Sequence, residues 1–147
     1  MIEPRLALLQ RQARTNDSKV VLLVLDGVGR FQFAPYLIRR VCRQAQLDYA
    51  VVRFDWQFGA VGEIWTDLMW LRRNRLQAVR FARLVRRLRR EHHKRTIHIF
   101  AFSGGNGVAA FGCAYLKDGD MIDTLIMAQP ALSPRFDLSK ALRAAKR

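Results

Sequence analysis

The chain has 147 residues, half of them hydrophobic, and its 26 Lys and Arg outnumber its 12 Asp and Glu to give a formal net charge of +14. This length and composition predict a single domain, residues 1–147, with a packed core, and they exclude intrinsic disorder. No apolar run reaches the roughly 18 residues that span a bilayer, and the apolar patch at residues 6–9 is too short for a secretion signal, so we expect neither a transmembrane nor a secreted protein.

Strands and helices alternate along the sequence. Apolar, β-branched runs predict four strands, at residues 19–25, 49–54, 96–102 and 122–128. Helical sequence lies at residues 35–46, from about 63 to 93, after residue 103, and from a cap at 137–139 to the C-terminus. Strands separated by helices predict an α/β fold, a three-layer sandwich with a mostly parallel sheet and right-handed crossovers.

The two cysteines, Cys42 and Cys113, are isolated from each other and have no CxxC spacing. They therefore predict neither a disulfide framework nor a zinc site. We expect a reduced, cytoplasmic setting and no bound metal.

Most of the positive charge lies between residues 72 and 95, where eleven basic residues face one acidic residue, a net charge of +10. Four apolar residues there have the i, i+3, i+4, i+7 spacing of a helix face that packs on the core: Phe81, Leu84, Val85 and Leu88. Four arginines lie on the other side of the predicted helix: Arg83, Arg86, Arg87 and Arg90. We interpret them first as a solvated outer face. The alternative is a basic, non-catalytic module that binds nucleic acid or an anionic membrane surface.

A serine directly follows the third predicted strand. Ser103 stands between the apolar residues 96–102 and a glycine-rich segment, residues 104–107, after which small residues begin a helix. A serine on such a strand-to-helix turn exposes its hydroxyl, and the positions two before and two after it have to be small because strand and helix pass close together. Those positions are Ala101 and Gly105. The pattern predicts a nucleophile elbow.

The same glycines allow a second interpretation. Gly105, Gly107 and Ala110 have the spacing of a dinucleotide-binding fingerprint. That fold needs an acidic residue about 20 positions further on, at the end of the next strand, to bind ribose hydroxyls. The next predicted strand ends in Gln129-Pro130 instead. We therefore favour the elbow over a dinucleotide site, and we rank a third interpretation, an ordinary glycine-rich turn, between these two.

The order of these signals resembles the N-terminal half of an α/β-hydrolase over residues 18–147. A glycine loop, residues 26–29, ends the first predicted strand, residues 54–56 give the second an aromatic exit, and Ser103 follows the third. In this family the serine so placed is the nucleophile of acyl transfer, as in serine esterases and lipases. The resemblance implies a partial α/β-hydrolase core that acts on small-molecule carboxylic esters without a cofactor.

The resemblance also implies an oxyanion hole made of backbone N–H groups. One would belong to the residue after the serine, Gly104, and another to Gly27 or Val28 in the glycine loop. Asp26 in that loop is the one carboxylate that we expect near the site, where it would orient a ligand or hold the loop.

The histidine of a catalytic triad is missing from its usual place. In the hydrolase fold the triad runs Ser, Asp or Glu, His along the chain, and no histidine follows Ser103. His98 lies five residues earlier, about 16 Å back along the same predicted strand, and His92 and His93 precede that strand. A base has to lie within about 3 Å of the serine hydroxyl. We expect His98 to be a buried, hydrogen-bonded strand residue instead.

The later carboxylates are poor replacements for the triad acid. Asp118, Asp120 and Asp123 follow the elbow helix, at the opposite end of the sheet, and Asp137 is expected to cap the last helix. The chain thus has a nucleophile and oxyanion elements without a base. We expect it to be inactive or very weak alone, as a C-terminally incomplete serine hydrolase or one completed by a second chain.

Overall fold

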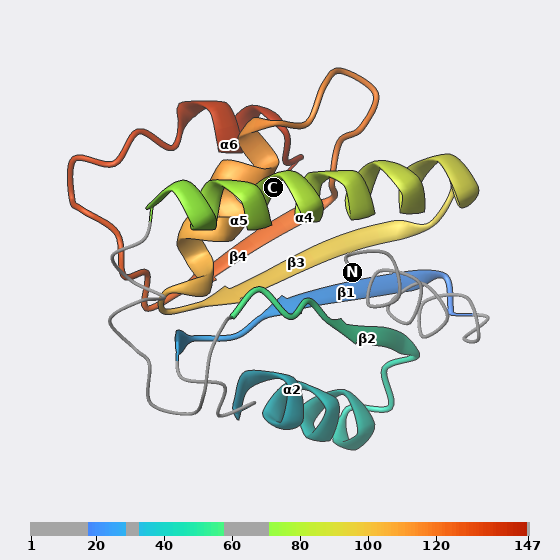
Figure 1. Ribbon diagram of the computed structural model, residues 1–147. Coiled ribbons are helices and arrows are strands. Elements are labelled where there is room, and N and C mark those ends of the chain that lie inside the picture. The colour runs from blue at the N-terminus through green and yellow to red at the C-terminus, as the bar shows by residue number, and fades with distance from the viewer. Residues whose placement is uncertain (1–17, 29–32, 58–70, 147) are drawn as a thin grey trace.

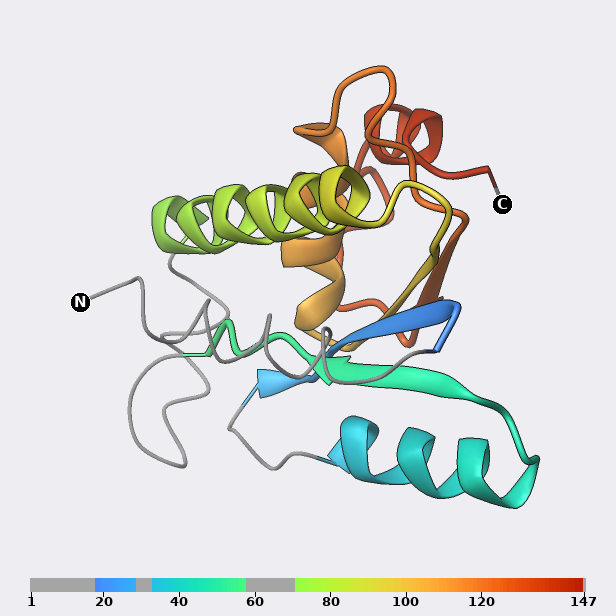
Figure 2. The same cartoon turned by 90° about the vertical axis from the view of Figure 1, so that its right-hand side faces the viewer.

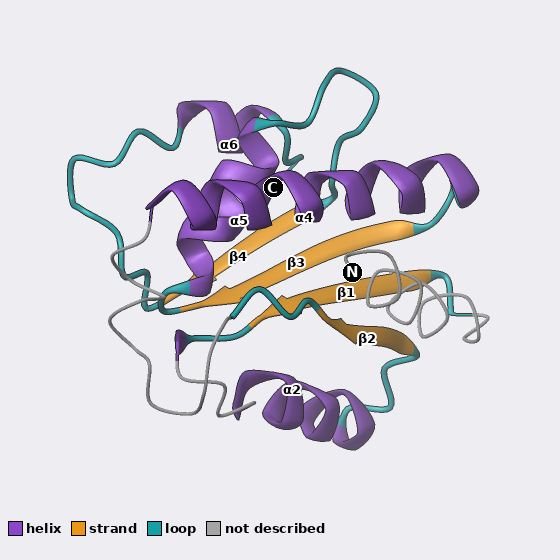
Figure 3. Cartoon of the chain, in the orientation of Figure 1, coloured by secondary structure: helices purple, strands orange, loops and turns teal. Residues whose placement is uncertain are grey.

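The computed structural model of the chain describes residues 18–28, 33–57 and 71–146 (Figure 1). Strands and helices alternate in the order β1 (Val20–Leu25), α2 (Phe33–Gln44), β2 (Tyr49–Arg53), α4 (Leu71–Glu91), β3 (Thr96–Phe102), α5 (Gly105–Ala114), β4 (Thr124–Ala128) and α6 (Ser139–Arg143). The four strands form one parallel sheet with the order β2-β1-β3-β4 (Figure 3). The predicted α/β class is confirmed.

Helices lie on both faces of the sheet, so the protein has three layers (Figures 1 and 2). On one face α2 packs on β1 and β2, and on the other α4 and α5 cover the sheet, with α6 packed beside α5. Strand β3 alternates accordingly: Ile97 and Ile99 are buried toward α4 and α5, whereas Phe100 faces the α2 side. This alternation is expected because successive side chains of a strand point to opposite faces.

The apolar row of α4 is buried as the sequence predicts. Phe81, Leu84 and Val85 are fully buried, and they share a core cluster with the inward residues of β1 and β3. Helix α5 crosses α4 closely at Gly112, where a Cβ atom would lie 2.5 Å from Phe81 Cδ1. A larger residue at that position has no room.

Several predicted boundaries differ from the structure. Helix α2 is Phe33–Gln44 rather than residues 35–46, α4 ends at Glu91 rather than near residue 93, and β4 begins at Thr124 rather than at residue 122. The predicted start of the long basic helix near residue 63 lies outside the described residues. The last helix does not continue to the C-terminus. It ends at Arg143, after which the Ile122 N–H donates to Ala144 O (2.9 Å) and the Lys146 N–H donates to Ile122 O (3.1 Å). The backbone partner of the residues after α6 is Ile122, which lies two residues before β4, and helix propensity does not reveal this pairing.

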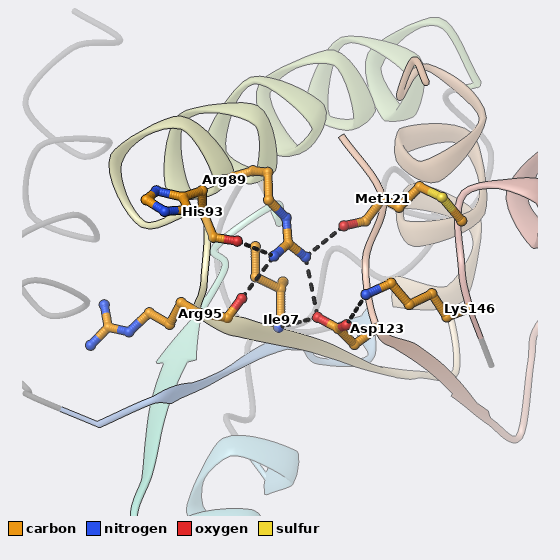
Figure 4. Close-up of polar contacts among 7 residues, drawn as sticks. All are labelled: Arg89, His93, Arg95, Ile97, Met121, Asp123 and Lys146. Carbon is orange, nitrogen blue, oxygen red and sulfur yellow. Dashed lines mark hydrogen bonds and ion pairs between the residues drawn. The ribbon is translucent and has the colours of Figure 1, made fainter. Parts of the chain in front are cut away.

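A polar cluster lies at the amino ends of β3 and β4 (Figure 4), whereas Ser103 follows the carboxyl end of β3. The Asp123 carboxylate accepts hydrogen bonds from Lys146 Nζ (2.7 Å), the Ile97 N–H (2.9 Å) and Arg89 (3.2 Å). Arg89 also donates to the Met121 carbonyl (2.6 Å). Burial raises the pKa of Asp123, but these donors outweigh it and lower that pKa to about 2. The cluster ties α4, β3 and the C-terminal residues together.

No helix among the described residues is both long enough and apolar enough to cross a bilayer.

Candidate functional site

The site lies at the carboxyl ends of β1 and β3, between which the strand order of the sheet reverses. From β1 the chain passes through α2 to β2 on one side, and it returns through α4 to β3 on the other side of β1. In open α/β sheets the carboxyl ends of two such strands form a crevice in which ligands bind. Here the residues at that position are Asp26 to Val28 after β1 and Ser103 to Gly105 after β3.

Ser103 has the strained backbone expected of an elbow. Its φ is +48°, in the left-handed region, directly between the last residue of β3 and the first turn of α5. A residue other than glycine pays about 1–2 kcal/mol for that conformation. The turn is fixed to the end of β4, because the Ser103 N–H donates to Ala128 O (3.1 Å). The geometric expectation for this turn is confirmed, and the catalytic role of the serine stays a prediction.

Asn106 stabilises the turn from its buried side, a role that the sequence analysis does not predict. Its side chain is fully buried, and Nδ2 donates to both Ser103 O (2.8 Å) and Ala128 O (3.0 Å). Oδ1 of Asn106 accepts no hydrogen bond within the described residues. A polar residue between two glycines at a helix start is the signal that could have identified it, since Asn side chains often bond nearby backbone.

Glycines let the elbow approach the end of β1. A Cβ atom on Gly105 would lie 2.6 Å from Asp26 O and 2.7 Å from Leu25 O, and one on Gly104 would lie 2.8 Å from Val28 Cγ1. The small residue at 105 is therefore required by the neighbouring strand β1, and not by the serine's own strand as the sequence suggested. Ala101, the other predicted small position, is fully buried in the main core.

The Ser103 side chain starts beside the glycine loop. A Cβ atom on Gly27 would lie 3.3 Å from both Ser103 Cβ and Phe102 Cδ1, so a larger residue at Gly27 would press on the serine. Ser103 itself is half-buried. The Ser103 side chain therefore lies directly beside Gly27 in the loop after β1.

Asp26 holds this loop in place. It is 5 % exposed, and its Oδ1 accepts hydrogen bonds from the Gly27 N–H (2.9 Å) and the Ala34 N–H (3.4 Å). Its carbonyl oxygen accepts from Trp56 Nε1 (2.8 Å), and the Gly27 carbonyl accepts from Gln57 Nε2. Of the two roles left open for Asp26, the structure shows the one that holds the loop.

This network changes the expected oxyanion donors. The Gly27 N–H is bound to the Asp26 carboxylate, so it does not offer a free donor as the sequence interpretation had suggested. The N–H groups of Val28 and Gly104 donate to no acceptor among the described residues. Their residues are also in contact, since Gly104 lies against the Val28 side chain. Of the predicted oxyanion donors, Val28 and Gly104 therefore keep an unbound N–H group in the described part of the chain.

The histidines lie away from the elbow. His92 and His93 follow the end of α4, at the amino end of β3, while Ser103 follows its carboxyl end. His98 is half-buried in the middle of β3 with its ring 5.9 Å from that of Tyr49. The expectation that His98 is buried and hydrogen-bonded is wrong for Nδ1, which has no partner within the described residues.

The remaining acidic candidates have other partners. Asp137 accepts a hydrogen bond from the Ser139 N–H (2.8 Å) at the start of α6, and this bond lowers the pKa of its carboxyl group. Asp137 thus binds the first N–H of α6, although the N-cap residue itself is Leu138, whose side chain makes no capping bond. Asp120 lies 3.6 Å from Arg86, and Asp123 belongs to the cluster at the opposite end of the sheet.

The predicted basic patch on α4 is only partly exposed to solvent. Arg83, Arg87 and Arg90 are exposed. Arg86 is half-buried instead, because its guanidinium donates to Tyr115 O (3.0 Å). Arg87 pairs with Glu91 one turn further along the helix (2.9 Å). Part of the positive charge that the alternative interpretation offers to a polyanion is thus neutralised within the protein.

Among residues 18–28, 33–57 and 71–146, no group of three or more His, Cys, Asp or Glu side chains could hold a metal ion. Comparisons with models of known protein families, with curated proteins and with solved structures find no match for this chain.

Proposed function

We propose that this chain is the nucleophile-bearing part of a serine hydrolase that acts on carboxylic esters. The observation that carries the proposal is the turn at Ser103. This serine has a left-handed φ of +48°, and it lies between the parallel strand β3 and helix α5, at the crevice formed by the carboxyl ends of β1 and β3. Strained backbone angles of this kind are enriched at active sites. Gln46 and Gln129 also have positive φ, but neither has a hydroxyl group or opens a helix. The resemblance of the sequence to α/β-hydrolases points to the same chemistry.

In the proposed reaction the Ser103 Oγ attacks the ester carbonyl carbon. Its proton passes to a base, and the carbonyl oxygen becomes an oxyanion that accepts hydrogen bonds from the N–H groups of Gly104 and Val28. The C–O bond to the alcohol then breaks, and the alcohol takes the proton from the base. In the second half of the reaction the base takes a proton from water, and the water oxygen attacks the carbonyl carbon of the acyl-serine. The bond to Ser103 Oγ then breaks, and Oγ takes the proton back from the base.

The base comes from outside the residues described here. None of the three histidines lies at the carboxyl end of β3. The Asp26 carboxylate holds the loop through two backbone hydrogen bonds to Oδ1, and its Oδ2 is buried without a partner among the described residues. We therefore propose that a further polypeptide segment or a second chain supplies the base. Without it the serine hydroxyl has its ordinary weak nucleophilicity, so this chain alone is expected to turn over esters close to the background rate.

Imidazole can test this proposal by replacing the missing base. The chain is incubated with p-nitrophenyl acetate, with and without imidazole, and the acetylated residues are located by mass spectrometry. We expect imidazole to raise the acetylation of Ser103 well above that of Ser133, a serine that is exposed in the loop before α6. The Ser103→Ala variant should lose that adduct and keep any adduct on lysines. Equal acetylation of Ser103 and Ser133 in the presence of imidazole would contradict the proposal.

The runner-up function is a polyanion-binding surface on α4, favoured by the exposure of Arg83, Arg87 and Arg90. Changing these three arginines to Glu would abolish such binding and leave the fold intact, because the apolar row of α4 faces the core. Binding of a nucleic acid that persists in this variant at low salt would exclude α4 as the surface.

A further inference from the structure

Exposed apolar side chains are concentrated on one helix. Of the nine large hydrophobic residues that are exposed in the described part of the chain, four belong to α2 and a fifth, Leu47, follows it closely. The four in α2 are Phe33 (61 % exposed), Tyr36 (63 %), Leu37 (44 %) and Val41 (50 %). Single exposed hydrophobic residues are common on proteins, but a group of them on one element marks an interaction surface.

Helix α2 is apolar on two sides. Ala34 and Cys42 are buried in the cluster that covers β1 and β2, as the inner face of an amphipathic helix should be. A second apolar row is exposed to solvent, and it consists of residues spaced four positions apart: Phe33, Leu37 and Val41. In both Figure 1 and Figure 2, α2 is the outermost described element on its side of the sheet. No other described element covers α2 on this side of the sheet.

The same helix is basic. Between Phe33 and Gln44 it has no acidic residue and has three exposed arginines, Arg39, Arg40 and Arg43. Arg39 donates to the Val51 carbonyl (3.3 Å), whereas Arg40 and Arg43 have no hydrogen bond or ion pair within the described residues. The outer surface of α2 thus combines an apolar row with two available positive charges.

We propose that the outer surface of α2 docks the protein on an anionic membrane, beyond any role that it has in ester hydrolysis. An amphipathic helix of this kind lies in the plane of the interface, with its apolar row among the headgroups and its arginines on anionic lipids. A nucleic acid would use Arg40 and Arg43 but leave Phe33, Leu37 and Val41 in water. A second copy would bring two chains of net charge +14 together with the same arginines facing each other.

Helix α4 is a weaker membrane surface in spite of its larger charge. Its apolar row is fully buried, and Leu76 is its one exposed large hydrophobic residue in the described part of the chain. Arg87 is also paired with Glu91. Helix α4 can therefore offer charge without an apolar row, which gives weak binding that salt abolishes.

Co-sedimentation with vesicles tests the proposal. We expect the protein to bind vesicles of phosphatidylcholine and phosphatidylglycerol in a two-to-one ratio at physiological ionic strength, and to bind pure phosphatidylcholine at least about tenfold more weakly. The double variant Leu37→Asp, Val41→Asp should lose at least about tenfold in binding to the mixed vesicles. The control double variant Leu76→Asp, Leu142→Asp changes residues on α4 and α6 that are more exposed than Leu37 and Val41, and it should bind like the wild type.

A second pair of variants separates the two basic surfaces. Arg40→Gln with Arg43→Gln should weaken binding to the mixed vesicles about tenfold or more, and Arg83→Gln with Arg90→Gln on α4 should weaken it less. Far-ultraviolet circular dichroism and the urea midpoint verify folding, and Leu37→Ser with Val41→Ser replaces the Asp variant should that variant unfold.

Several results would overturn the proposal. They are failure of the wild type to bind mixed vesicles, binding of the Leu37 and Val41 variants that equals the wild type, or a larger loss from the α4 variants than from the α2 variants. A dimer that these α2 variants dissociate would make the surface a contact between copies. Binding of a short RNA that needs Arg40 and Arg43, without binding to mixed vesicles, would make it a nucleic-acid surface.

Discussion

Gly105 and Asp26 meet at the closest approach between the elbow and the first strand, where a Cβ atom on Gly105 would lie 2.6 Å from the Asp26 carbonyl oxygen. The same carbonyl accepts the hydrogen bond from Trp56, so it has little freedom to move away. The position of the serine turn is therefore set by backbone contact with β1, and the loop that carries Val28 is set by the same contact.

Gly105→Ala should destabilise the protein by about 1–3 kcal/mol, because the added methyl group meets two backbone carbonyl oxygens that cannot rotate away. Gly107→Ala is the matched control in the same helix. There the nearest heavy atom to an added Cβ is Leu132 Cδ2 at 3.6 Å, and alanine favours a helix by about 1 kcal/mol over glycine. Urea unfolding of both variants measures the difference. Equal midpoints would contradict the close approach.

Ser103→Gly should make the protein more stable than Ser103→Ala by about 1 kcal/mol, since glycine adopts a φ of +48° without the steric cost that alanine pays. Both variants lack the hydroxyl group, so the comparison isolates the backbone strain. Thermal unfolding monitored by circular dichroism is the measurement. An alanine variant as stable as the glycine variant would mean that the turn relaxes out of the left-handed region in solution.

Asn106→Asp should cost more stability than Asn106→Ala, although Asp has the same shape as Asn. The amide nitrogen donates to two carbonyl oxygens, and a carboxylate placed there would repel both while losing its own hydration. We expect a loss of more than about 2 kcal/mol at neutral pH for Asn106→Asp. Because protonation removes the charge, that loss should shrink as the pH falls below about 5. A loss that does not depend on pH would contradict this account.

The stability of the protein should fall in acid through Asp123. The pKa of this carboxyl group is about 2 in the folded protein against 3.8 ordinarily, so the folded state favours its ionised form. That contribution, on the order of 2 kcal/mol, is present above pH 4 and is lost as the pH falls through about 2. Asp123→Asn should therefore be less stable than the wild type at pH 7, with the gap closing toward pH 2. Asp118→Asn, at an exposed position, serves as the control and should show no such gap.

Local patterns predicted most of the fold. The apolar runs gave β1, β2 and β3 nearly to their ends, and the helical spacing of Phe81, Leu84 and Val85 gave the buried side of α4. The turn at Ser103 was also predictable, because its signal lies within a few consecutive residues.

Two of the missed features depend on residues that are distant in sequence, and one depends on the orientation of a neighbouring side chain. Asn106 was missed because one of its acceptors, Ala128 O, lies beside it only once β4 has paired with β3. The Gly27 N–H was expected to be free because its acceptor is a side-chain oxygen whose orientation the sequence does not reveal. The end of α6 is likewise set by pairing with Ile122, and not by a stop signal of its own.

The strand order has a consequence for how the chain folds. Strand β1 is the most apolar of the four, and it lies between β2, which follows soon after, and β3, which follows roughly 70 residues later. During synthesis at about 5–20 residues per second, one hydrogen-bonding edge of β1 has no native partner for several seconds. That edge of Val20–Leu25 is where the nascent chain is most exposed to aggregation, so production of the protein should depend on temperature and chaperones more than its final stability would suggest.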